Sequence, residues 1–137
     1  MENHFDLSDS DFEKKFSSCH LNPAHFTHEA HLRLAWIHIN KYGIGQAEKK
    51  IQHQLQKFVE FVGAKNKYNT TLTLAALKAV HHFMCKSDAD NFKDFITEFP
   101  RLNYNFKELM DFHYGFDIYN AEKAKREFLR PDLVPFD

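Results

Sequence analysis

Apolar residues recur every three to four positions along most of this 137-residue chain, which is the spacing of one face of an α-helix. The alternation of apolar and polar residues that indicates strands is almost absent. Gly, Asn and Pro separate the periodic stretches, and hairpin dipeptides do not. We therefore predict an all-α fold, a compact helical bundle of about five to seven helices.

Capping residues and chain breakers mark the ends of the expected helices. Thr27 is a good N-cap for a helix over residues 28–42, and Gly43 is a good terminator for it. Asn69 or Thr70 can cap another long helix that reaches about residue 85. The remaining helices are expected near residues 8–19, 46–62, 87–99, 106–112 and 121–129, followed by an extended tail over 130–135.

Length and charge narrow the classes of function. A chain of 137 residues is the size of one domain, so we expect a single helical domain over residues 1–137. The formal net charge is −1 and the basic residues are spread along the chain, which argues against a nucleic-acid partner. No apolar run is long enough for a membrane span or a signal peptide, so we expect a cytoplasmic protein with two reduced cysteines.

Three histidines fall on the apolar side of the helix expected at residues 28–42 when it is wound at about 100° per residue. His28 and His31 are three positions apart, which places their Cβ atoms about 5–6 Å from each other. Both rings could therefore reach one ion or one substrate. His38 lies on the same stripe, two turns further along, and is predicted to be a substrate-binding residue.

The position of the histidine pair favours its neutral form. The positive end of the helix dipole and the proximity of the two rings both disfavour protonation. A neutral imidazole can bind Zn, Fe, Ni or Cu, or accept a proton as a general base. We predict that His28 and His31 are catalytic residues or ligands of one divalent transition-metal ion. The alternative, which the sequence leaves open on equal terms, is that they are core histidines with ordinary hydrogen bonds.

The helix expected to start at Asn69 or Thr70 supplies the second half of the predicted site. Asn69 and Thr73 are four positions apart on its apolar side, and Tyr68 comes just before it. These three side chains could bond a small polar molecule held by the histidines. In the alternative interpretation, Asn69 caps the helix and Thr73 bonds back to a carbonyl of the preceding turn.

Three segments carry a resemblance to a known group of proteins. They are the FTHEAHLRLAW segment at residues 26–36, the YNTTLT segment at 68–73 and the PDLVP ending at 131–135. Together they resemble a family of small, uncharacterised bacterial helical proteins, which shares a histidine pair and a Tyr-His-x-Thr second motif. The resemblance implies site positions but no activity. This chain has Asn69 where the family pattern has His, so a third histidine ligand is missing there.

Two functions remain open. One is a metal-dependent or histidine-based enzyme that acts on a small polar molecule. The other is a non-catalytic module that binds a ligand or a protein, with structural histidines. Sequence signatures of metalloproteases, P-loop proteins, dinucleotide enzymes and serine hydrolases are absent. The fifteen Phe would also allow a hydrophobic homodimer face.

Overall fold

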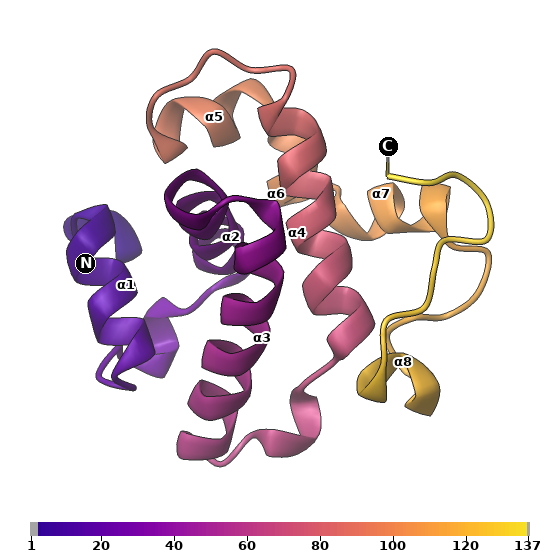
Figure 1. The fold of residues 1–137 in the computed structure, drawn as a ribbon, viewed down its shortest axis with the longest axis horizontal. Coiled ribbons are helices and arrows are strands. Elements are labelled where there is room, and N and C mark those ends of the chain that lie inside the picture. The colour runs from indigo at the N-terminus through magenta and orange to yellow at the C-terminus, as the bar shows by residue number, and fades with distance from the viewer. Residues whose placement is uncertain (1–2, 137) are drawn as a thin grey trace. The chain divides into compact units, whose positions relative to one another are not determined.

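The computed structural model describes residues 3–136 and is all-helical (Figure 1). Met1, Glu2 and Asp137, which the single-domain prediction includes, lie outside the described residues. In the described range there are eight α-helices, three short 3₁₀ turns and no strand. The α-helices are α1 (Asp9–Ser17), α2 (His28–Tyr42), α3 (Ile44–Phe61), α4 (Thr70–Met84), α5 (Phe92–Glu98), α6 (Pro100–Tyr104), α7 (Phe106–His113) and α8 (Glu122–Arg126).

The predicted fold class is confirmed, and the caps account for the agreement at several boundaries. Thr27 accepts a hydrogen bond from the backbone N–H of Ala30 at 3.2 Å, and Gly43 ends α2 at a φ of 80°. A positive φ of this size is a conformation that glycine adopts without steric strain. Asn69 caps α4 by accepting from the N–H of Leu72 at 2.9 Å.

Helix α6 was not expected from the sequence. Pro100 ends α5 as predicted, but it also occupies the first turn of α6. Proline suits this position because its missing N–H has no intrahelical partner in the first turn and its φ is already helical. The same residue therefore stops one helix and starts the next.

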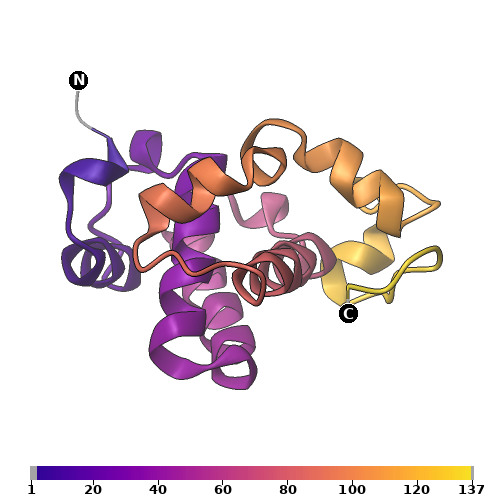
Figure 2. The ribbon, with the colours of Figure 1, turned by 90° about the horizontal axis from the view of Figure 1, so that it is seen from above.

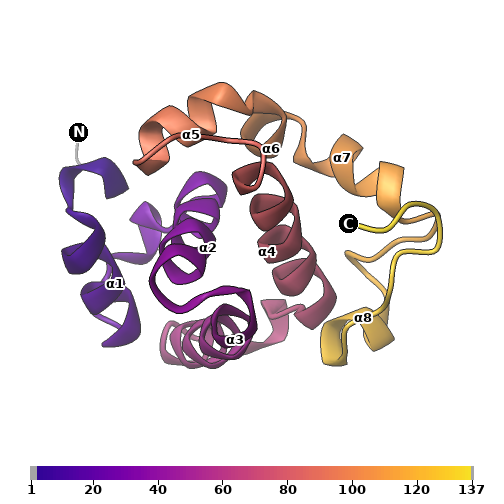
Figure 3. The same cartoon turned by 45° about the horizontal axis from the view of Figure 1, so that its top comes forward.

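Contacts within the chain define two compact units, residues 1–68 and 69–137. In the first unit, α2 packs on α3 and α1 contacts both (Figure 3). Phe16 stacks on Phe26 and on Phe58, with ring centroids 4.7 Å apart in each pair. Offset aromatic pairs of this kind add to the free energy gained by burying apolar area. An aromatic cluster therefore joins α1 to α3 beside the start of α2.

In the second unit, α4 packs on α8, and α6 contacts both α5 and α7. The predicted tail at 130–135 is free of helix, as expected, and it runs back beside α7 (Figure 2). The Leu133 N–H donates to the carbonyl of His113 at 3.0 Å, and the hydroxyl of Tyr114 donates to the carbonyl of Leu129 at 2.8 Å. The tail is thus a structural part of this unit. The prediction of a single domain stays a prediction.

Candidate functional site

His28 is exposed at the first position of α2, so the prediction that it faces inward is wrong. The prediction from helical periodicity requires other parts of the chain to cover the apolar side of the helix along its whole length. The first turn follows an exposed stretch, Asn22–Ala24, and the inward stripe begins only at Ala30. The side chain of His28 can therefore meet solvent.

His31, one turn further along α2, is the inward member of the pair. Its Nε2 atom is buried and has no hydrogen-bond partner among the described residues. The ring lies 5.8 Å from the ring of Phe26, in the aromatic cluster beside the helix start. A buried polar nitrogen without a partner costs roughly 1–3 kcal/mol of folding free energy, so such an atom calls for an explanation.

The surroundings of His31 favour the neutral state that the sequence predicts for it. Burial and, to a smaller extent, the charge of nearby His28 together lower the pKa of His31 from 6.5 to about 4. Burial is the larger cause, and helix position alone does not predict it. The nearby ring of His28 is the smaller cause and acts in the direction that the sequence predicts.

The predicted metal site consists of two histidines, and the described residues supply no third His, Cys, Asp or Glu ligand beside them. Among residues 3–136, no group of three or more His, Cys, Asp or Glu side chains is arranged to hold an ion. Catalytic and structural zinc sites use three or four protein ligands. A metal bound by His28 and His31 therefore stays a prediction. Its remaining ligands would have to be something other than His, Cys, Asp or Glu side chains of residues 3–136.

His38 is fully buried, as its place on the apolar stripe predicts, and it takes part in a polar cluster of the first unit. Its Nε2 atom is 2.8 Å from Oε1 of Gln54 in α3, and its Nδ1 atom is 3.9 Å from a carboxylate oxygen of Glu13 in α1. Burial lowers the pKa of His38, while the Gln54 bond and Glu13 oppose this effect. The Gln54 bond joins α2 to α3, whereas Nδ1 of His38 is buried without a hydrogen-bond partner among the described residues. The role of His38 as a substrate-binding residue stays a prediction.

Glu13 is the residue of this cluster that the sequence analysis missed. Its carboxylate accepts hydrogen bonds from Lys41 at 2.9 Å and from the hydroxyl of Tyr42 at 2.8 Å. Burial raises the pKa of Glu13, but these two bonds and His38 outweigh it, so the net pKa is lowered. The weak signal in the sequence was an acidic residue beside Phe12 on the inward side of the first helix.

Asn69 and Thr73 use their polar atoms at the start of α4. Asn69 caps the helix and also donates to the carbonyl of Ile118 at 2.7 Å. Thr73 donates to the carbonyl of Asn69 at 2.7 Å. These are the contacts of the alternative that the sequence left open. The role of Asn69 and Thr73 as substrate-binding residues stays a prediction. The same holds for partly buried Tyr68, which is the last residue of the first unit, whereas Asn69 is the first residue of the second.

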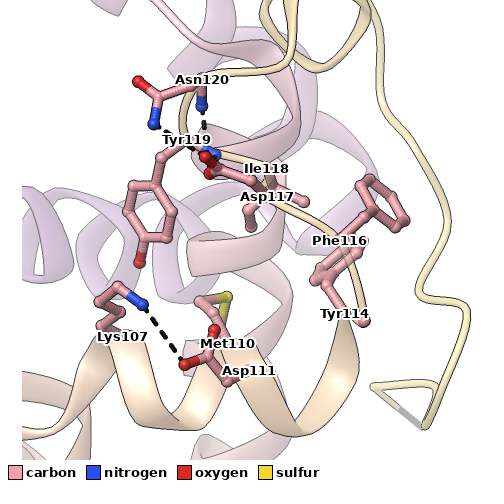
Figure 4. A pocket seen from close by; sticks show the side chains of 10 residues that line it. Lys107, Met110, Asp111, Tyr114, Phe116, Asp117, Ile118, Tyr119 and Asn120 are labelled. Carbon is pink, nitrogen blue, oxygen red and sulfur yellow. Dashed lines mark hydrogen bonds and ion pairs between the residues drawn. The ribbon is translucent and has the colours of Figure 1, made fainter.

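A cavity of about 530 Å³ lies in the second unit, between α7 and the loop at 114–120 (Figure 4). Its charged groups bond to each other or to nearby backbone. Lys107 is 3.4 Å from Asp111, and Asp117 accepts from the side-chain amide of Asn120 at 2.8 Å and from the N–H of Tyr119 at 2.9 Å. These bonds lower the pKa of Asp117 and keep it charged. No predicted site residue lines this cavity.

The chain matches no known family model, no curated protein and no solved structure. The resemblance carried by the three motifs therefore stays a prediction. Within residues 3–136, no helix combines the length and the apolar composition that crossing a bilayer requires.

Proposed function

We propose that this chain is a helical binding module that holds a small polar molecule at His31. The observation that carries the proposal is the buried Nε2 atom of His31, which lacks a hydrogen-bond partner among the described residues. A ligand that bonds this nitrogen would remove the free-energy cost of leaving it unpaired. The apolar surroundings of the ring would strengthen that bond, because the local dielectric is low.

The low pKa of His31 favours binding over acid–base catalysis. A general base works best when its pKa lies near the working pH. With a pKa of about 4, the His31 ring is neutral at pH 7 and is a weak base. It can still donate or accept one hydrogen bond with a polar molecule. This property supports the non-catalytic alternative among the two functions that the sequence leaves open.

A metal-dependent enzyme is the second candidate. The spacing of His28 and His31 supports it, because residues three positions apart at the start of α2 lie on neighbouring parts of the helix surface. Two imidazoles are half of a tetrahedral zinc ligand set. Titration of the purified chain with Zn²⁺ and Ni²⁺ by calorimetry distinguishes the candidates. Binding at one site that is lost in both His28→Ala and His31→Ala supports the metal, whereas its absence leaves the binding module.

A His31→Phe variant tests the binding module. Because Phe matches the neighbouring rings and has no polar atom to satisfy, we expect its thermal midpoint at pH 7 to equal or exceed that of the wild type. Acetate, phosphate, acetamide and glycerol serve as probes. At least one probe should raise the midpoint of the wild type and leave that of His31→Phe unchanged.

His53→Gln is the matched control, since His53 is an exposed histidine of α3. This variant should respond to every probe as the wild type does. A large loss of stability in His31→Phe, with identical probe responses in all three proteins, would show that His31 is a structural residue only.

A further inference from the structure

A second cavity, of about 350 Å³, lies within the second unit and is assigned no role by the proposed function. Its walls come from α4, α6, α7 and the C-terminal segment. Ala79, Leu109 and Phe136 form buried apolar parts of the wall, and exposed Phe112 lies at the rim. This size is within the range of cavities that hold small molecules, and a mostly apolar lining is typical of them.

The C-terminal wall of this cavity is held in place by His113 of α7. Nδ1 of His113 is 2.6 Å from the carbonyl oxygen of Val134, and the rings of His113 and Phe136 stack with centroids 4.1 Å apart. The Leu133 N–H also donates to the carbonyl of His113. The wall is therefore formed before any ligand arrives, which lowers the entropy lost on binding.

Two cationic side chains, Lys86 and Arg101, give the cavity its charge. Both line it, and among the lining residues that the structure describes there is no Asp or Glu. Both are exposed, and within residues 3–136 neither forms an ion pair with a carboxylate. They differ in this from Lys107 of the cavity in Figure 4, which is paired with Asp111. Two uncompensated cations beside an apolar cavity create a positive potential that attracts an anion.

We infer that this cavity binds a small amphipathic carboxylate, with its apolar body against Leu109, Phe112 and Phe136 and its carboxylate beside Lys86 and Arg101. The apolar walls account for affinity, since burying apolar area is the main favourable contribution. The two cations account for selection of an anion over a neutral molecule of the same shape. Arg101 can bond both oxygens of a carboxylate with its planar guanidinium.

Octanoate and octanol are the probes, because they differ only in the head group. Isothermal titration calorimetry of the full chain should show one octanoate site and weaker binding of octanol. A Lys86→Met, Arg101→Met double variant should bind octanoate about tenfold more weakly, as expected for the loss of two partly solvated charge contacts. Its binding of octanol should stay within about twofold of the wild type.

Three controls make the result decisive. Lys93→Met removes an exposed cation of α5 that does not line the cavity, and it should bind octanoate as the wild type does. His31→Phe should also bind octanoate normally, which separates this inference from the proposed function. Val134→Trp, at the rim, should weaken both probes by obstruction. The inference is overturned if octanoate does not bind, or if the double variant binds it as tightly as the wild type.

Discussion

Helices α2 and α4 begin alike, but they differ in whether the polar side chains of the first turns have hydrogen-bond partners. Each starts after a side-chain cap, Thr27 in α2 and Asn69 in α4. At α4, Asn69 and Thr73 find backbone partners within 3 Å. At α2, the Nε2 atom of His31 is buried without a partner among the described residues. The sequence predicts that these residues belong to one site, yet the polar atoms at α4 are hydrogen-bonded and Nε2 of His31 is not.

The difference follows from the reach of the side chains. Asn and Thr have short polar groups that bond to nearby backbone, which is why they occur at helix starts. The imidazole Nε2 lies too far from its own backbone for such a bond and needs a partner from another element or from a ligand. A short polar residue at a helix start is therefore weak evidence for a binding site, and a buried ring nitrogen of a histidine without a hydrogen-bond partner is stronger evidence.

The largest effect that we expect for this comparison is a loss of the free energy of unfolding as the pH falls, caused by His31. The pKa of His31 is about 4 in the folded chain and 6.5 in its ordinary state. Between these values the unfolded chain binds a proton that the folded chain does not, so stability is lost as the pH falls through this range. The loss due to His31 should be about 3 kcal/mol, measured by urea denaturation at pH 7 and pH 4.

His31→Phe isolates this contribution, because other groups titrate in the same direction. The pKa values of His4 and His38 are also lowered, mainly by burial. The wild type should therefore lose more stability than His31→Phe between pH 7 and pH 4. Equal losses in both proteins would mean that the His31 ring gains a proton in the folded state, and the contrast with α4 would disappear.

The sequence predicted those features of the fold that depend on neighbouring residues. The N-cap at Thr27, the terminator at Gly43 and the cap at Asn69 are all present, because each is a bond or a backbone conformation within one turn. Helical periodicity also predicts one apolar face for the helix near residues 46–62, made up of Ala47, Ile51, Leu55, Phe58, Val59 and Val62. The first four are buried in α3, whereas Val59 and Val62 are half-buried.

Features that depend on distant segments were not predicted. The cluster around Glu13 joins residues from three helices, and the cavity beside Lys86 and Arg101 is formed by four separate segments. Periodicity says which side of a helix is buried, but not what lies against it. The exposure of His28 has the same cause, since nothing in its own helix reveals that the first turn is uncovered.

We expect the next largest effect, a loss in the free energy of unfolding, from the substitution Asn69→Ala. It removes the cap on the Leu72 N–H and the bond to the carbonyl of Ile118. We expect a loss of about 2 kcal/mol in the free energy of unfolding, because a cap and a buried hydrogen bond are each worth about 1 kcal/mol. Asn69→Ser retains a capping oxygen but cannot reach Ile118, so it should lose about half as much. Wild-type stability in both variants would contradict the structural role of Asn69.

Thr71→Val should have a smaller effect, of about 1.5 kcal/mol. The hydroxyl of Thr71 donates to the carbonyl of Glu127 at 2.7 Å and accepts from the N–H of Leu129 at 2.9 Å. These bonds attach the segment after α8 to α4. Valine keeps the shape of threonine but leaves both backbone groups without this partner. Faster amide hydrogen exchange at Leu129 should accompany the loss, and unchanged exchange there would contradict it.

Thr73→Val should have the smallest effect, less than about 0.5 kcal/mol, although Thr73 is as buried as Thr71. The hydroxyl of Thr73 bonds only the carbonyl of Asn69, which also accepts from the N–H of Thr73 at 3.0 Å. Valine therefore leaves no backbone group unpaired and fills the same volume. The two substitutions are identical in chemistry, lie one half-turn apart and differ in what the hydroxyl bonds. If denaturant unfolding shows Thr73→Val to be as damaging as Thr71→Val, then the hydroxyl of Thr73 has a partner beyond its own helix, and α4 would resemble α2 in needing one.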